Sequence, residues 1–156
     1  MKGGVRTMLK DIITKDTIRL NVDAKDWEDA VRIGGTLLVN VHAAEERYVD
    51  AMIETVKDIG PYIVILEGIA MPHARPEKGA LKMGMSLVTL KNPIEFGNEE
   101  NDPVKLVISF CAVDSKTHLK ALSQLMVLLE DEDNIESILH SDSVDDVIRI
   151  INSFSK

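Results

Sequence analysis

The sequence predicts an α/β fold, a single domain in which helices flank both faces of a mixed β-sheet. Four strand-like runs, at 17–23, 62–66, 83–90 and 104–112, are separated or followed by segments whose apolar residues recur at helical spacing. Helices before, between and after strands are typical of a sheet that helices cover. The 156 residues suit one domain with a sizeable core, and no repeat, linker or low-complexity segment divides them.

The first strand and the first helix each carry a local signal. Residues 17–23 (TIRLNVD) alternate apolar and polar side chains, which is typical of a short strand. Between residues 27 and 41 the apolar side chains recur at helical spacing, and Asp26 is placed to cap that helix. Gly34 and Gly35 each weaken the helix by about 1 kcal/mol relative to alanine, so we expect this pair to pack closely against a neighbouring element.

A second helix and three further strands follow. Apolar residues at 48–59 recur at helical spacing, and Gly60-Pro61 ends that helix. Residues 62–66 (YIVIL) form a continuous apolar run rich in β-branched side chains, which predicts a strand covered on both faces. Residues 83–90 and 104–112 are also strand-like, and a turn-rich stretch separates them.

The remaining chain predicts three helices. Leucine and methionine side chains form one stripe over residues 119–129, a short helix is expected at 135–139, and a third at 144–154. The chain therefore ends in helices, and the predicted sheet is complete by residue 112.

Composition and charge exclude several classes of protein. The net charge of −8 argues against a nucleic-acid-binding surface, which needs a basic patch. No apolar run approaches the roughly 18 residues that span a bilayer, and the N-terminal MKGGVRTMLK lacks the apolar stretch of a signal peptide. A single cysteine, Cys111, rules out an intramolecular disulfide and suits a reducing compartment. We therefore expect a cytoplasmic protein with no nucleic-acid partner and no membrane insertion.

Two histidines follow predicted strands closely enough to lie at one edge of the sheet. His73 stands in GIAMPHARP, between two prolines. Pro72 fixes the approach to the histidine, and Pro76 biases Arg75 toward extended geometry, so this loop is stiff. His118 follows the last predicted strand after a short turn. Ligands of open α/β sheets gather beyond the carboxyl ends of strands, so the two imidazoles are candidates to face one another across that edge.

Each histidine also has a purely structural interpretation. His73 is a candidate for a hydrogen-bonded loop histidine, and so is His118 if it has no partner. If His118 occupies the first turn of its helix, the helix dipole disfavours the imidazolium, and a neutral ring can donate a hydrogen bond to an arriving phosphoryl oxygen. His42 and His140 follow helical stretches, where we expect them to be structural or solvent-facing.

Other chemistries lack their motifs. The sequence has no H-E-x-x-H, no C-x-x-C and no glycine-rich phosphate loop. Residues 84–88 end in valine where a G-x-S-x-G elbow needs glycine. The acidic stretch 98–102 lacks the calcium-loop pattern and is expected to be a solvated turn, and Cys111 is expected to be a small core residue. We therefore expect neither a metal nor a cofactor.

The residues around both histidines resemble a known family. GIAMPHAR, a following strand, an acidic turn, NDPVKLVISFCAVD and then THLKAL resemble the fructose/mannitol-type enzyme IIA of the bacterial sugar phosphotransferase system. The stretches GPYIVILEGIAMPHARPEKG, SLVTLKNPIEF and LLEDEDNIESIL look most like the ascorbate-specific branch. The resemblance implies one type-2 IIA domain over residues 1–156, with its core at about 11–154.

The resemblance further implies a phosphotransferase that relays a phosphoryl group. The family's motif histidine corresponds to His73, which would take the group from the phosphocarrier HPr and pass it to a cysteine of a cognate enzyme IIB. Sugar uptake by the membrane component IIC, of L-ascorbate in this branch, is coupled to that last phosphate. The second family histidine corresponds to His118, which would stabilise the phosphorylated state. A largely neutral imidazole suits the nucleophile, and local donors can stabilise a loose transition state without a metal.

The sequence departs from the mannitol branch at one point. That branch carries an arginine in the helix that corresponds to EERYVDAMIETVKD, at a position near Thr55. This sequence has no arginine at that point of the helix. A cation is still expected near the phosphoryl group, because charge spreads over its oxygens during transfer. Arg75, two residues beyond His73, is the preferred substitute, and Arg47 is the second candidate.

Two other functions remain open at this point. A regulatory IIA-like domain, of the nitrogen or regulator-associated type, would use the same His73 but signal through phosphorylation-dependent protein contacts. Transfer of the phosphoryl group to a IIB would separate the two. A non-catalytic interaction domain with incidental histidines would acquire no acid-labile phosphate from phosphorylated HPr. The sequence does not distinguish between the two ring nitrogens of His73.

Overall fold

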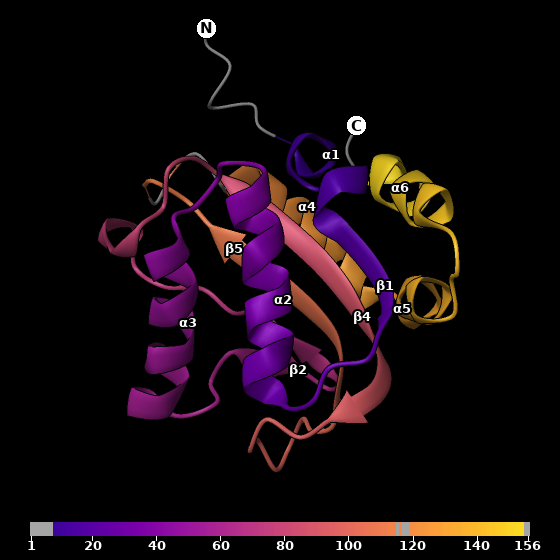
Figure 1. The fold of residues 1–156 in the computed structure, drawn as a ribbon. Helices are drawn as coiled ribbons and strands as arrows, with labels where there is room; N and C mark the ends of the chain where they lie inside the picture. The colour runs from indigo at the N-terminus through magenta and orange to yellow at the C-terminus, as the bar shows by residue number, and fades with distance from the viewer. Residues whose placement is uncertain (1–7, 115, 117–118, 155–156) are drawn as a thin grey trace, which may run out of the picture.

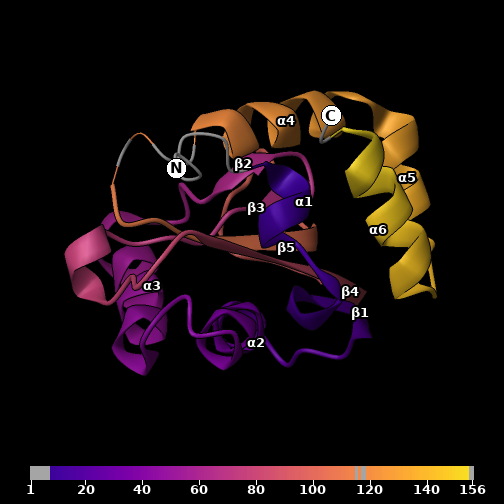
Figure 2. The ribbon, with the colours of Figure 1, turned by 90° about the horizontal axis from the view of Figure 1, so that it is seen from above.

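The computed structural model describes residues 8–114, 116 and 119–154, which form three layers with a five-stranded sheet in the middle (Figure 1, Figure 2). The strands are β1 (Ile18–Val22), β2 (Val64–Leu66), β3 (Ile69–Ala70), β4 (Gly84–Ile94) and β5 (Val104–Cys111). The helices are α1 (Leu9–Ile12), α2 (Trp27–Asn40), α3 (Glu46–Ile59), α4 (Leu119–Glu130), α5 (Glu132–Leu139) and α6 (Val144–Ser153), with 3₁₀ turns η2 (Lys15–Thr17) and η3 (Pro76–Lys78).

The sheet is mixed, with strand order β1-β4-β5-β3-β2. β1 runs parallel to β4, and β3 runs parallel to β5. β4 and β5 pair antiparallel, as do β2 and β3. β3 and β5 therefore end at the same edge of the sheet, and the loop that carries His73 leaves from that edge. The predicted α/β class and mixed sheet are confirmed.

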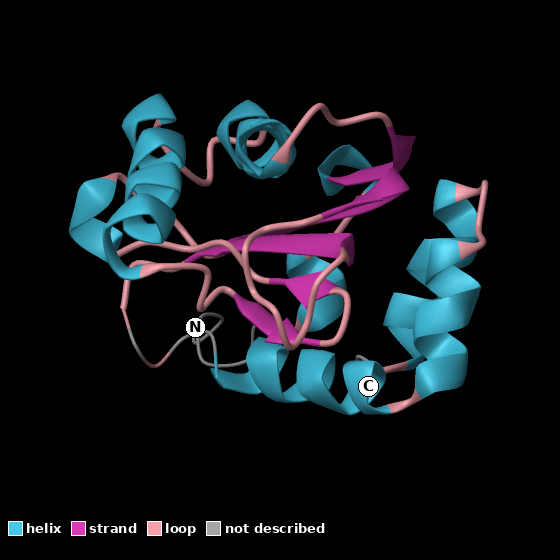
Figure 3. Ribbon diagram, turned by 90° about the horizontal axis from the view of Figure 1, so that it is seen from below, coloured by secondary structure: helices cyan, strands magenta, loops and turns pink. Residues whose placement is uncertain are grey.

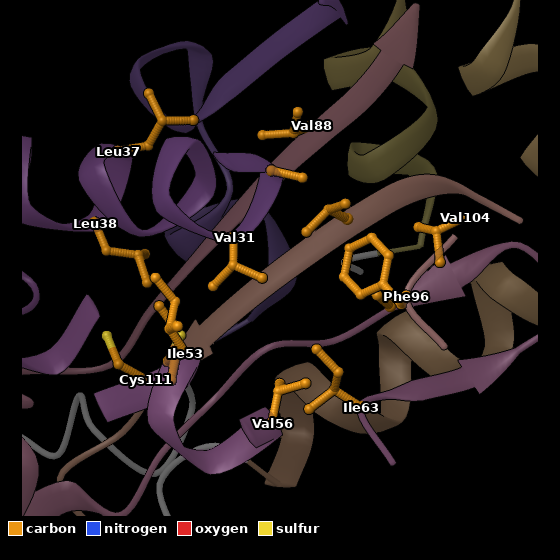
Figure 4. Close-up of a cluster of buried hydrophobic side chains, with 14 of the residues drawn as sticks. Val31, Leu37, Leu38, Ile53, Val56, Ile63, Val88, Phe96, Val104 and Cys111 are labelled. Carbon is orange, nitrogen blue, oxygen red and sulfur yellow. The ribbon is translucent and has the colours of Figure 1, made fainter. Parts of the chain in front are cut away.

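Helices cover both faces of the sheet, as predicted. Figure 2 shows α2 and α3 on one side and α1, α4, α5 and α6 on the other, and Figure 3 shows the same layers from below. Alternate residues of β4 point to opposite sides, because side chains alternate along a strand. Val88 and Leu90 join the core under α2 and α3, part of which Figure 4 shows, whereas Met85 and Leu87 join the core under α4 and α6.

The first helix that the sequence predicts is α2, and it forms and packs as expected. The Asp26 side chain accepts a hydrogen bond from the Asp29 N–H at 2.9 Å, which caps the start of α2. A Cβ on Gly34 would lie only 2.5 Å from Ser109 Oγ, and one on Gly35 would lie 2.8 Å from a Val49 methyl group. The two glycines therefore let α2 approach the sheet on one side and α3 on the other.

The region between α3 and β4 differs from the expectation. The predicted strand at 62–66 is shorter, starts at Val64 and forms the edge of the sheet, and Tyr62 is 75% exposed. The turn that follows Gly60 takes up the first residues, since the Val64 N–H donates to the carbonyl of Pro61. The chain then turns at Gly68 into β3, which the sequence did not predict because two residues show no periodicity.

Candidate functional site

His73 lies just beyond the end of β3, and its ring has a fixed orientation. Its Nδ1 is 2.8 Å from the carbonyl oxygen of Met71. A carbonyl oxygen only accepts hydrogen bonds, so in the neutral ring Nδ1 carries the proton and Nε2 holds the free lone pair. The side chain is exposed. The neutral ring therefore has one nitrogen held by a hydrogen bond, and its other nitrogen has a free lone pair.

The loop that carries His73 is tied to the end of β5. The Phe110 N–H donates to the carbonyl of Pro72 at 3.0 Å, which continues the pairing of the strand into the loop. The Phe110 ring lies edge-on to the imidazole, with ring centroids 6.2 Å apart. One residue of β5 therefore positions both the backbone and the ring of the histidine segment.

Tyr48 of α3 fixes the other side of the loop. Its hydroxyl accepts a hydrogen bond from the Ala74 N–H at 3.0 Å and lies within donating distance of the carbonyls of Phe110, at 2.8 Å, and Ala74, at 3.1 Å. Only 1% of Tyr48 is exposed. Burial raises the pKa of Tyr48 well above its ordinary value, so the hydroxyl keeps its proton and remains a donor.

Two cationic side chains share a pocket with His73. The pocket is lined by Thr55, His73, Ala74, Arg75 and Lys78. Arg75 immediately precedes the 3₁₀ turn η3, and Lys78 is its last residue. Neither cation has a carboxylate within 4 Å among the residues that the structure describes. Their charge is therefore available to an anion that arrives at His73.

Arg47, the second candidate from the sequence, does not line this pocket. Its guanidinium pairs with the Glu45 carboxylate at 3.0 Å and donates to the Glu77 carbonyl at 3.1 Å. It lines a neighbouring hollow that Thr55 and Lys78 also border. Arg75 is thus the better placed of the two predicted arginines, and Lys78 is a cation that sequence reasoning missed.

The chain matches a known family over most of its length. Residues 11–154 match the EIIA 2 family of the phosphoenolpyruvate-dependent sugar phosphotransferase system. This chain belongs to that family. As an EIIA component it is a phosphotransferase, and it carries a phosphoryl group in a sugar phosphotransferase system.

Named relatives cover nearly the whole EIIA chain. The ascorbate-specific PTS system EIIA component of Escherichia coli strain K12 is 42% identical over 146 residues, which is 92% of this chain and 95% of that protein. Its counterpart in Salmonella typhimurium is 43% identical over 146 residues, which again cover 92% of this chain and 95% of that protein. The likeness therefore extends well beyond the histidine motif.

Solved structures share the fold. The solution structure of the mannitol-specific cryptic phosphotransferase enzyme IIA CmtB from Escherichia coli has a TM-score of 0.84 and 36% identity, and the match covers 94% of this chain and 99% of that one. The complex of enzyme IIAMtl with phosphorylated enzyme IIBMtl from Escherichia coli matches with a TM-score of 0.80 and 31% identity, over 91% and 99% of the chains.

Thr55 lies where the resemblance to mannitol-type EIIA components leads one to expect an arginine. Its side chain lines the His73 pocket, and its hydroxyl donates to the Ala51 carbonyl at 2.8 Å. The position therefore faces the candidate site but supplies no charge. In this EIIA component the positive charge of the pocket comes from Arg75 and Lys78.

The remaining histidines of this EIIA component fall into two groups. His118 lies outside the described residues, so its predicted role as a donor stays a prediction. His42 and His140 are exposed, as expected for residues without a role in the site. His140 Nδ1 lies 2.9 Å from the carbonyl of Glu136 and 3.6 Å from its carboxylate, which ties the ring to its own helix.

The other candidates for chemistry have structural roles. Cys111 is buried, and its Sγ lies 3.5 Å from the Ala43 carbonyl and 3.4 Å from that of Lys82. Burial raises the pKa of the Cys111 thiol to about 12, so it stays protonated and unreactive. No group of three metal-ligating side chains occurs among the described residues, and no helix within them has both the length and the apolar character needed to cross a bilayer.

Proposed function

We propose that His73 is the residue that carries the phosphoryl group, through Nε2. On this proposal the group comes from phosphorylated HPr and goes to a cysteine of a cognate IIB. The observation that supports the assignment is the 2.8 Å contact of His73 Nδ1 with the Met71 carbonyl, because it leaves Nε2 as the nucleophile.

The proposed transfer has two steps, and each forms one bond to phosphorus and breaks another. The Nε2 lone pair attacks the phosphorus of phospho-HPr, the N–P bond forms, and the bond from phosphorus to HPr breaks. The His73 ring keeps its Nδ1 proton and becomes positively charged, and the Met71 carbonyl stabilises that charge by accepting the hydrogen bond. In the second step the IIB thiolate attacks the phosphorus, the N–P bond breaks with its electron pair returning to Nε2, and His73 is neutral again.

Arg75 and Lys78 would stabilise the phosphoryl oxygens in both steps. Phosphoryl transfer has a loose transition state with charge spread over three oxygens, so fixed positive charge lowers its free energy. Both cations line the pocket with His73. His118 would add a donor hydrogen bond from a neutral ring, as the family resemblance implies.

The assignment to an ascorbate system rests on the named relatives. The EIIA components with 42–43% identity are ascorbate-specific. The Escherichia coli IIA in complex with phosphorylated IIB supports a IIB as the partner of this chain. We therefore place the protein in the cytoplasm, between HPr and the IIB of an L-ascorbate system, with the membrane component IIC as its indirect partner.

Reconstitution of the relay tests the proposal. The chain is incubated with labelled phospho-HPr and then with candidate IIB proteins, and the label is followed. His73→Ala should accept no phosphoryl group while its circular dichroism stays that of the native fold, because the side chain is exposed. His140→Ala is the matched control, and it should accept label fully. Labelling of His73→Ala would contradict the assignment. Labelling of the native chain without transfer to any IIB would favour a regulatory domain.

His118 is tested in the same assay. His118→Ala should still be labelled on His73 but should pass the group to IIB about tenfold more slowly, since a hydrogen bond to a charged group contributes about 1.5–3 kcal/mol. His118→Gln keeps a donor and should retain more activity. Label on His118 itself, or unchanged transfer by both variants, would rule out the helper role.

A further inference from the structure

A hollow of about 810 Å³ lies at the opposite end of the strands from His73. Its walls are the β2–β3 hairpin, the start of β5, the C-terminal half of α4 and most of α5. From Leu106 in this hollow to Phe110 beside His73, β5 advances four residues, or about 13 Å. The hollow shares no lining residue with the His73 pocket. A molecule bound here would therefore leave His73 accessible.

The floor of the hollow is apolar. Ile69 and Leu106 of the sheet and Leu129 of α4 are buried beneath it, and Ile135 and Leu139 of α5 are half-buried at its side. Met126 stands at the opening with 39% of its surface exposed. A methionine has three rotatable bonds and a polarizable sulfur, so it adapts to the shape of an apolar side chain that enters.

The rim of the hollow is strongly acidic. It carries five carboxylates against one ammonium group, that of Lys105. The Asp102 carboxylate is engaged by the N–H groups of Phe96, Gly97 and Asn98. The other four rim carboxylates belong to exposed residues, Glu67, Glu130, Glu132 and Glu136. Charges of one sign around an apolar hollow concentrate the negative potential there, which selects a cationic partner.

The exposed carboxylates stand on different walls of the hollow. Glu67 is on the β2–β3 hairpin, whereas Glu132 and Glu136 lie one turn apart on α5. An occupant that meets both walls needs an apolar stripe for the floor and cations on both sides of that stripe. An amphipathic helix with lysine or arginine flanking its leucines has that layout, and helix-in-groove binding is a recurrent mode of recognition.

We propose that this acidic hollow docks a cationic amphipathic helix of a partner protein. Apolar side chains of the helix enter the hollow over Met126 and Leu139, and its cations pair with Glu67, Glu132 and Glu136. Such docking holds the partner close without covering His73, so it raises the local concentration of the carrier at that partner. The proposal does not depend on which residue carries the phosphoryl group.

A defined peptide tests the docking site. The probe is a 14-residue helix-forming peptide of leucine and lysine, with the leucines on one face, and the control peptide has glutamate at every lysine. Each is titrated into the ¹⁵N-labelled full chain at about 0.15 M salt. The lysine peptide should shift amide signals at 66–69, 102–106 and 126–139 and leave those at 73–78 unchanged. The glutamate peptide should shift none.

Matched variants separate docking from general attraction to an acidic protein. Glu132→Gln with Glu136→Gln should weaken binding about fivefold or more, because exposed charges across an interface control association. Asp16→Asn with Asp23→Asn makes the same change in net charge at the β1 edge of the sheet and should weaken binding less than twofold. Met126→Gln should also weaken it, through lost apolar contact. Equal weakening by the two double variants, or shifts centred on His73, would overturn the proposal.

Phosphoryl transfer gives an independent readout. Glu132→Gln with Glu136→Gln should accept label from phospho-HPr at the rate of the native chain, and saturating lysine peptide should not slow that labelling. Inhibition by the peptide would mean that it covers the His73 face, which contradicts the docking site. Failure of His73→Ala to abolish labelling would overturn the His73 assignment but leave the docking result intact.

Discussion

The hydroxyl of Tyr48 accepts a hydrogen bond at 3.0 Å from the backbone N–H of Ala74, the residue next to His73. The same oxygen lies 2.8 Å from the Phe110 carbonyl, so one buried atom joins α3, the histidine loop and the end of β5. The histidine loop of this EIIA component is therefore positioned by a buried side chain that does not line the His73 pocket.

Replacement of that hydroxyl should affect stability and transfer together. Tyr48→Phe leaves the Ala74 N–H without its buried acceptor, and an unsatisfied buried group costs about 1–3 kcal/mol in the free energy of unfolding. Labelling from phospho-HPr should slow about tenfold, because a small displacement of His73 spoils its alignment. Urea unfolding and labelling rates measure the two effects. Tyr62→Phe, at a 75% exposed site, is the control and should change neither.

The two pocket cations should act on transfer and not on the fold. Arg75→Gln and Lys78→Gln should each slow labelling about tenfold, since a hydrogen bond to a charged group contributes about 1.5–3 kcal/mol. Both residues are exposed, so melting temperatures should stay near the native value. Arg47→Gln removes an arginine already paired with Glu45 and should have the smallest effect. A larger loss with Arg47→Gln than with Arg75→Gln would reverse the assignment.

The contact between Gly34 and Ser109 predicts a rescue between two substitutions. Gly34→Ala puts a methyl group 2.5 Å from Ser109 Oγ and should lower the free energy of unfolding by about 1–3 kcal/mol. Ser109 Oγ is buried with no hydrogen-bond partner among the described residues, so Ser109→Ala should cost little. The double variant with Gly34→Ala and Ser109→Ala should be at least as stable as the native chain, because alanine in place of glycine stabilises a helix by about 1 kcal/mol. Additive losses in a double-mutant cycle would refute the contact.

Alkaline pH should destabilise the fold through Cys111. Burial raises its pKa from 9.0 to about 12, so above pH 9 the unfolded chain loses the thiol proton while the folded chain keeps it. Stability from this group is complete below pH 9 and falls by about 1.4 kcal/mol per pH unit up to about pH 12. Urea unfolding of Cys111→Ala between pH 8 and 11 should show a shallower decline than the native chain. If the free energy of unfolding fell equally steeply with pH in the variant and in the native chain, the Cys111 thiol would be hydrated in the folded protein.

Local signals in the sequence account for the longer helices and for the stiff loop on which His73 lies. Asp26 caps α2 as expected, and the prolines around His73 mark the loop on which it lies. The edge position of β2 and the existence of β3 depend on pairing with other strands. That pairing cannot be predicted from the local sequence, and β3 has too few residues to show a periodicity. The roles of Tyr48 and Lys78 near His73 could not be predicted for the same reason. A tyrosine on an apolar helix face and a surface lysine give no local indication of the residues that they contact in the fold.

The hydrogen bond between His73 Nδ1 and the Met71 carbonyl also dictates the order of events in the proposed relay. With one nitrogen occupied, the phosphoryl group must arrive at and depart from the same atom, Nε2. Donor and acceptor then exclude each other, and the first must dissociate before the second binds. The proposed relay should therefore follow ping-pong kinetics. Double-reciprocal plots at several fixed acceptor concentrations should be parallel lines, and excess unphosphorylated HPr should compete with IIB.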